Sequence, residues 1–183
     1  MKPYDDNIVT FRLMLDGYLA AVVRFEEAAR SKDSAAAFRP LFEALNWAAA
    51  LDERLGKHWA PEGEPLAWSW RASLSGAEAM EGLRFVRNRL HHQWAAALTL
   101  DGDGRSYTRT YPLVYFEWRW RSVDEIPAGR ERTGEREAYA EHLEGRPARA
   151  TLATLADVFL HASDLLEPRI AESRPADDTA DPA

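Results

Sequence analysis

Cysteine is absent from the sequence, which excludes disulfide bonds, thiolate metal sites and a cysteine nucleophile and fits a reducing compartment. The chain also lacks an apolar run long enough to span a membrane, and no basic segment leads into an apolar one. We therefore expect neither a membrane span nor a secretory signal. The expected location is the cytoplasm.

Several common catalytic motifs are missing as well. The sequence has no glycine-rich phosphate loop of either common spacing, no His-Glu-x-x-His and no Gly-x-Ser-x-Gly. The neighbouring His91 and His92 make a poor metal site, because adjacent residues on a helix point about 100° apart. We expect neither a metal nor a cofactor.

Lysine is scarce and occurs only at positions 2, 32 and 57, so nearly all of the 23 basic residues are Arg. This bias makes any single Arg weak evidence of function. The net charge of −7 argues against broad nucleic-acid binding, and no complex with duplex DNA is expected. Residues 81–94, however, carry three Arg and two His against one Glu. Such a locally positive segment could bind one or two phosphates.

Apolar residues at helical spacing predict an all-α protein. Long helices are expected over about 5–31, after the linker 32–37 as far as Pro61, over 75–98, and from Pro147 to Pro168, with Pro40 in the first turn of the second. A short helix is expected over 135–143. The predicted fold is an up-and-down bundle of four long helices plus one short helix in a domain of residues 1–172. The polar residues 173–183 are predicted to be a disordered tail.

A β-hairpin is expected between the third and fourth helices, as an insertion at about 101–123. Residues 114–121 alternate aromatic or apolar with charged side chains, and 105–111 is the expected partner strand. One hypothesis is a stacking platform for single-stranded bases. The other, which we favour, is that Phe116, Trp118 and Trp120 pack the hairpin onto the helices.

The loop 61–74 contains Trp68 and Trp70. Two tryptophans are unusual in an exposed loop, so this one is expected to fold over the core or an interface. A lid over a ligand is the alternative, and packing is the favoured interpretation.

The helix expected over 75–98 carries the most informative residues. Ser75 and Glu78 have the spacing of a capping box. One apolar stripe follows, and its members are Ala79, Leu83, Val86, Leu90, Trp94 and Ala97. Phe85 lies on the opposite, polar face, which suggests that this face is covered, with a second subunit as the obvious candidate.

Polar side chains occupy the rest of that helix surface. Arg87 is at the shoulder of the apolar stripe, with Arg84 and His91 further round, and Asn88 and His92 on the far side. Asn88 and His92 are four residues apart and therefore neighbours on the helix.

Arg87-Asn88 followed by His92, on the third long helix of an all-α chain, resembles the motif of the HEPN (higher eukaryotes and prokaryotes nucleotide-binding) superfamily. The family motif is an Arg, four to six residues and a His, often with Asn directly after the Arg. The resemblance implies a metal-independent endoribonuclease of toxin or defence type, whose dimer unites two copies of the motif. Other family members bind only nucleotides or proteins.

The chemistry of these side chains agrees with that expectation. RNA is cleaved when its 2′-hydroxyl attacks the adjacent phosphate, which requires proton transfer, suited to His92, and charge stabilisation, suited to Arg87. Asn88 could orient His92 or bind the ribose. Arg84, Arg89 and His91 are the predicted substrate-binding residues.

Two alternatives remain open. The basic residues of this helix could form an ordinary solvated face in an Arg-rich protein. The chain could also be a non-catalytic module that binds a nucleotide or a protein through the same face and the Trp-rich hairpin. The expected partners are a second copy of the chain, RNA or a nucleotide, and, for a toxin, an antitoxin protein.

Overall fold

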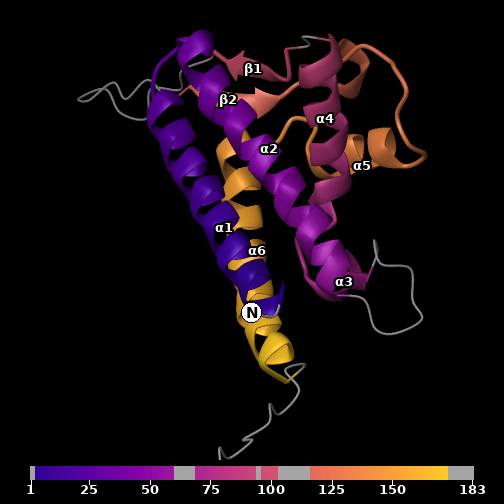
Figure 1. Cartoon of the computed structure of the whole chain (residues 1–183). Coiled ribbons are helices and arrows are strands. Elements are labelled where there is room, and N and C mark those ends of the chain that lie inside the picture. Colours follow the sequence, from indigo (N-terminus) through magenta and orange to yellow (C-terminus); the bar gives the residue numbers. More distant parts are fainter. Residues whose placement is uncertain (1–2, 60–68, 94–95, 103–115, 173–183) are drawn as a thin grey trace, which may run out of the picture.

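The computed structural model describes residues 3–59, 69–93, 96–102 and 116–172. It confirms the helical class (Figure 1). In chain order the elements are α1 (Pro3–Ala28), α2 (Ser34–Trp59), α3 (Ser69–Ser73), α4 (Ala79–Gln93), β1 (Leu98–Asp101), β2 (Glu117–Trp120), the 3-10 turn η1 (Val123–Glu125), α5 (Glu135–His142) and α6 (Ala148–Glu172). None of the described helices is both long and apolar enough to cross a membrane.

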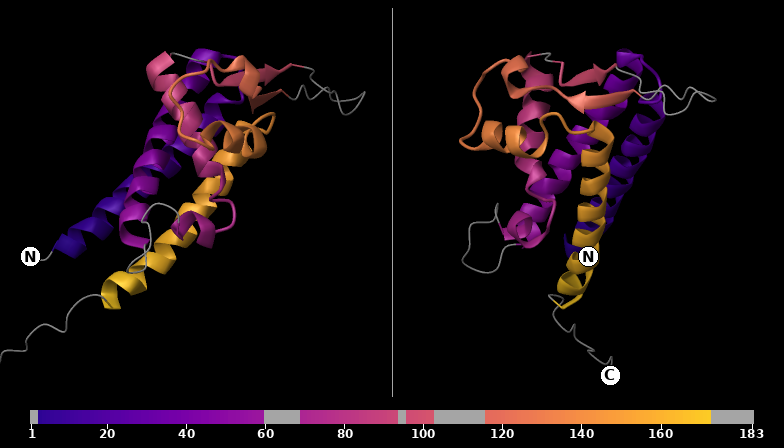
Figure 2. Two further views of the ribbon diagram at one scale, coloured as in Figure 1. Left: turned by 90° about the vertical axis from the view of Figure 1, so that its right-hand side faces the viewer. Right: turned by 180° about the vertical axis from the view of Figure 1, so that it is seen from behind.

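The helices α1, α2 and α6 enclose one part of the core. Figure 1 shows α1 and α2 side by side with α6 behind them, and the view from behind in Figure 2 brings α6 to the front. The inward face of α1 has the expected spacing, with Phe11, Leu15, Tyr18, Val22 and Phe25 buried. The Tyr18 hydroxyl donates a hydrogen bond to the Leu152 carbonyl oxygen at 2.7 Å, which fixes α6 against α1.

Several helix boundaries differ from expectation, among them those of α2 and α6. α2 begins at Ser34, because the Asp33 carboxylate accepts hydrogen bonds from the backbone N–H groups of Ala35 and Ala36 at 2.9 and 3.2 Å. Pro40 therefore lies inside the helix rather than in its first turn. α6 continues past Pro168, which was expected to end it, as far as Glu172.

The expected strand pairing was wrong. The helix predicted to reach Leu98 ends at Gln93, and Leu98–Asp101 forms β1, which pairs antiparallel with β2 so that Leu98 faces Trp120. The expected partner, residues 105–111, lies outside the described residues. Helical spacing at Ala97 was misleading, because a short strand that pairs with a distant segment carries little local signal.

The packing role of the tryptophans is confirmed. Trp118 and Trp120 are buried in the core, and their indole N–H groups donate to the Ser31 carbonyl oxygen at 3.2 Å and the Thr151 hydroxyl at 3.0 Å. Trp70, in α3, is also fully buried. Trp68 lies outside the described residues.

Helix α5 covers the face of α4 that was assigned to a second subunit. Phe85 has no exposed surface in the single chain, and its ring lies 5.2 Å from that of Tyr139. The helices approach closely at Gly82, where a Cβ atom would lie 2.9 Å from the Tyr139 Cα. The burial of Phe85 therefore needs no second subunit. The sequence did not show that α5 covers this face, because the contact joins residues over fifty positions apart.

Candidate functional site

A surface cavity of about 360 Å³ lies where α2, α4 and the segment before α5 meet. Its lining residues are Asn46, Ala49, Ala50 and Glu53 from α2, Arg84, Arg87 and Asn88 from α4, and Arg130, Arg132 and Glu135. We call it the arginine pocket. Three predicted site residues, Arg84, Arg87 and Asn88, therefore share one cavity, and its size falls at the lower end of the range for small-molecule sites.

Asn46 of α2 holds Arg87 and His91 together. Its amide nitrogen donates to the Phe42 carbonyl oxygen at 2.8 Å, and this bond turns Oδ1 towards α4. Oδ1 accepts a hydrogen bond from Arg87 Nε at 3.2 Å and contacts His91 Nε2 at 2.8 Å. One carbonyl oxygen can accept both bonds because it has two lone pairs. Sequence reasoning missed Asn46, whose place on α2 gives no sign that it faces the motif.

This arrangement determines the chemical state of His91. Because Asn46 Oδ1 is an acceptor, His91 carries its proton on Nε2, and Nδ1 of the neutral ring remains an acceptor. His91 is exposed, but partial desolvation of its ring, followed by the charges of Arg87 and His92, lowers the pKa of His91 below its ordinary value. The ring also packs against Phe42, with centroids 4.6 Å apart. His91 is therefore an oriented, neutral imidazole near neutral pH.

His92 follows His91 on α4. Both residues are exposed, and neither is among the described residues that line the arginine pocket. The two ring centroids lie 6.2 Å apart. Asn88 Oδ1 accepts a hydrogen bond from Arg87 Nη1 at 3.3 Å. The described hydrogen bonds do not include one between Asn88 and His92, so the expected orientation of His92 by Asn88 is not seen in the single chain.

Arg84 belongs to a buried charge cluster as well as to the pocket. Its Nε lies 2.6 Å from Oδ2 of the buried Asp52. Asp52 also accepts hydrogen bonds from Arg71 Nε at 2.8 Å and from the Trp70 indole N–H at 3.1 Å, while Arg71 pairs with Glu81. We call Asp52, Trp70, Arg71, Glu81 and Arg84 the Asp52 cluster. It fastens α3 and α4 to α2.

Arg89, predicted to bind substrate, faces away from the pocket. Its guanidinium is buried, lies 5.1 Å from the Phe85 ring centroid and pairs with Glu131 through Nη2 at 2.9 Å. Arg89 is not among the described residues that line the arginine pocket. A ligand in the arginine pocket would not touch it.

Arg130 and Arg132 were missed by the sequence analysis. They lie in a polar segment that was interpreted only as a loop. The one local feature that could have indicated a binding role is the pair of Arg residues that flank Glu131. Neither guanidinium is paired with a carboxylate in the part of the chain that the structure describes. Arg87 likewise bonds only to amides there, so three of the four pocket guanidiniums are available to an anion.

The cavity is suited to a phosphate-bearing ligand rather than to a metal ion. Among the described residues, no three His, Asp or Glu side chains are placed to hold a metal. The guanidiniums offer planar donor pairs that match phosphate oxygens. The carboxylates of Glu53 and Glu135 also line the cavity and could accept hydrogen bonds from ligand hydroxyl or amino groups. Comparison of the whole chain with protein-family models, curated proteins and solved structures gives no match.

Proposed function

We propose that the chain is a HEPN-like, metal-independent endoribonuclease of toxin or defence type, which acts as a homodimer and binds an RNA phosphate at Arg87. The observation that carries the proposal is the setting of Arg87. Its side chain lines the arginine pocket, is oriented by Asn46 and Asn88, and pairs with no described carboxylate. A guanidinium held by neutral amides keeps its full charge for a ligand.

The reaction needs only the chain's own side chains. The RNA 2′-hydroxyl loses its proton to a neutral imidazole and forms a bond to the adjacent phosphorus. The bond from phosphorus to the 5′-oxygen breaks, and that oxygen takes a proton from an imidazolium. The products are a 2′,3′-cyclic phosphate and a 5′-hydroxyl, and Arg87 offsets the additional negative charge on the phosphoryl oxygens.

A homodimer is proposed because one chain does not bring His92 into the pocket. The exposed His92 at the carboxyl-terminal end of α4 would enter a shared cleft if two α4 helices met there. The fold proposed for the unit is the four-long-helix bundle of residues 1–172. An antitoxin protein that covers the same cleft is the expected partner of a toxin.

A row of aromatic rings beside the pocket favours RNA over a free phosphate. Phe38, which is 47% exposed, stacks on Phe42 with centroids 5.9 Å apart, and Phe42 packs on His91. Exposed aromatic rings stack unpaired bases without strong sequence preference. A base bound at Phe38 would leave its backbone close to the His91 end of α4.

The second candidate is a non-catalytic module that binds a nucleotide or a protein. It is favoured by the two carboxylates, Glu53 and Glu135, in the arginine pocket and by the position of His92 outside it. Carboxylates repel an RNA backbone but accept hydrogen bonds from ribose hydroxyls or base amino groups. This candidate predicts no RNA cleavage and ligand binding that depends on Arg87; Trp120, which was expected to take part, is buried in the core.

Incubation of the protein with total RNA and a defined tRNA in EDTA tests the proposal. Wild type should cleave and leave 2′,3′-cyclic phosphate ends, whereas His92→Ala and Arg87→Ala should lose cleavage about 10²-fold or more while remaining folded and dimeric. His161→Ala, which removes an exposed His of α6, is the matched control and should cleave normally.

Retained cleavage in both His92→Ala and Arg87→Ala would refute the proposed active site. Lack of cleavage by wild type, with the dimer intact, would favour the binding module. Expression gives an independent observation, since an active toxin should be difficult to produce without its antitoxin. High yields of wild type would support the second candidate.

A further inference from the structure

Residues 127–134, which we call the arginine loop, connect η1 to α5 and form one wall of the arginine pocket. The loop has buried anchors at both ends, Ile126 and Glu135, which are 2% and 3% exposed. The Glu135 carboxylate accepts a hydrogen bond from the Arg132 backbone N–H at 3.2 Å. The loop is therefore held at both of its ends.

Glu131 fastens the middle of the loop to α4 and α5. Its carboxylate pairs with Arg89 at 2.9 Å and Arg136 at 3.8 Å, and it accepts the Gly129 backbone N–H at 3.0 Å. Desolvation alone would raise the pKa of Glu131. Hydrogen bonds from the backbone N–H groups of Glu131 and Gly129, together with the charges of Arg89 and Arg136, hold the pKa below its ordinary value. Glu131 is accordingly an ionised partner of two arginines.

The loop backbone is seated directly on α4. The Gln93 side-chain amide donates to the Ala128 carbonyl oxygen at 3.0 Å. A Cβ atom at Gly129 would lie only 1.6 Å from Arg89 Nη1, so the backbone touches the guanidinium that binds Glu131. These contacts leave the loop little freedom to move away from α4.

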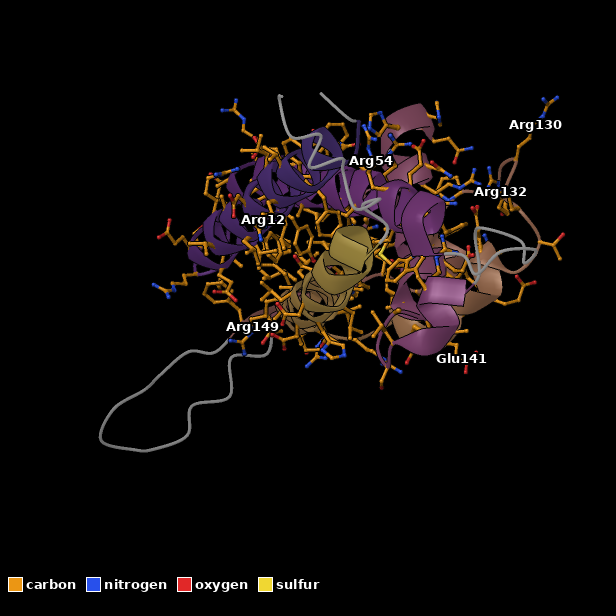
Figure 3. The ribbon with its side chains drawn as sticks, turned by 60° about the horizontal axis from the view of Figure 1, so that its bottom comes forward. Arg12, Arg54, Arg130, Arg132, Glu141 and Arg149 are labelled. Carbon is orange, nitrogen blue, oxygen red and sulfur yellow. The ribbon has the colours of Figure 1, made fainter. Side chains whose placement is uncertain are left out.

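Arg130 and Arg132 flank Glu131 in the sequence and line the arginine pocket. Figure 3 shows both arginines on this loop, at the opposite edge of the molecule from Arg149. The anchoring of Glu131 thus holds Arg130 and Arg132 in the lining of the cavity that Arg84 and Arg87 also line. The arginines of the pocket come from two segments that are over forty residues apart.

We infer that Arg130 and Arg132 bind a second phosphate of the RNA held at Arg87, and that Glu131 positions them through Arg89. The inference rests on the proposed function, because it takes RNA as the ligand. A cavity of about 360 Å³ has room for far more than one phosphate group, since a water molecule occupies about 30 Å³ of liquid. Arg87, Arg130 and Arg132, whose guanidiniums pair with no described carboxylate, match two successive phosphates of single-stranded RNA better than one.

Binding of a fluorescent 2′-O-methyl oligonucleotide, measured by anisotropy over a salt series, tests the binding half of the inference. This probe has RNA-like phosphates but no free 2′-hydroxyl, so it cannot be cleaved. Arg130→Ala and Arg132→Ala should each weaken binding on the order of tenfold and reduce the salt slope by about 0.7. Arg149→Ala removes the same charge from an exposed site on α6 and should leave the slope unchanged.

The failures of the two proposals are distinguishable in this experiment. If Arg87→Ala weakens binding while Arg130→Ala and Arg132→Ala behave like Arg149→Ala, the inference fails and the proposed function stands. If wild type does not bind the oligonucleotide, both fail. Loss of binding in Arg130→Ala and Arg132→Ala with the expected change in slope supports the inference.

The positioning role is tested with a pair of variants. Glu131→Gln leaves the buried Arg89 unpaired, so it should both destabilise the fold and weaken oligonucleotide binding. Arg89→Met combined with Glu131→Gln removes both charges of this pair and should regain most of the stability. Binding by this double variant should remain as weak as that of Glu131→Gln, because the loop is no longer fastened. Binding that recovers together with the melting temperature would overturn the positioning role.

Discussion

The Asp52 cluster and the arginine pocket lie next to each other on α4, and they use arginine in opposite ways. In the Asp52 cluster, Arg71 and Arg84 donate to a buried carboxylate, and Asp52 also receives the Trp70 indole N–H. In the arginine pocket, Arg87 bonds only to amides in the described structure. The comparison shows that the number of arginines on a helix says little about function in an Arg-rich chain. An arginine is informative about function when its N–H donors are not already bonded to carboxylates of the same chain.

The difference has an energetic reason. A buried carboxylate must receive hydrogen bonds and opposite charge, because an unpaired charge in the interior is costly. Arg71 and Arg84 are therefore committed to the fold. Surface guanidiniums without a carboxylate partner remain hydrated, and a phosphate can replace that water at a lower cost.

The largest effect is expected when the Asp52 cluster is broken. Asp52→Ala should lower the free energy of unfolding by about 3–5 kcal/mol, because Arg71 loses its buried carboxylate partner. Arg87→Gln, in the arginine pocket, should cost at most about 1.5 kcal/mol, the value of a hydrogen bond to Asn46. Urea denaturation followed by circular dichroism measures both. Equal losses in the two variants would abolish the distinction between structural and functional arginines.

A smaller effect is expected where the pocket wall meets α4. Gly129→Ala places a methyl group against the Arg89 guanidinium, so we expect a loss of about 1–3 kcal/mol in stability together with weaker oligonucleotide binding. Gly102→Ala is the matched control, because among the described residues its Cβ would meet only the Leu100 carbonyl oxygen at 4.0 Å. Thermal unfolding and anisotropy measure the two effects. Unchanged binding in Gly129→Ala would show that the loop need not contact α4 closely.

The smallest effect concerns the protonation of His91. Arg87→Gln should raise the pKa of His91, because a neighbouring positive charge that disfavours the imidazolium is removed. In wild type the lowered pKa means that the folded chain binds this proton less readily than the unfolded chain. Its contribution to stability is therefore lost as the pH falls below 6.5. An NMR titration of the imidazole carbons follows the change, and a pKa that does not respond to Arg87→Gln would place the two side chains apart in solution.

Much of the helical fold could be predicted because its signals are local. The buried stripe of α1 follows from apolar spacing, and α5 was expected over nearly the residues it occupies. The inward direction of the Trp118 and Trp120 side chains follows from the alternation of aromatic and charged residues along the strand. The pairing of β2 with β1 and the packing of α5 over Phe85 could not be predicted, because both join segments that are distant in the sequence.

The candidate site was predicted in part. Arg84, Arg87 and Asn88 do share a cavity, whereas Arg89, His91 and His92 do not line it in the described structure. Position on one helix gives the direction of a side chain but not the element that it meets. Arg89 and Arg87 are two residues apart, yet one meets Glu131 and the other Asn46.

By itself the sequence determined the helical class, most helix positions and the inward-facing aromatic residues, because backbone geometry and apolar burial repeat at fixed intervals along the chain. Only the tertiary structure decided which arginines are paired. That choice depends on carboxylates and amides brought by other elements, such as Asp52 and Asn46 from α2 and Glu131 from the arginine loop. Charge pairing is a short-range contact between distant segments, so it exists only once the chain has folded.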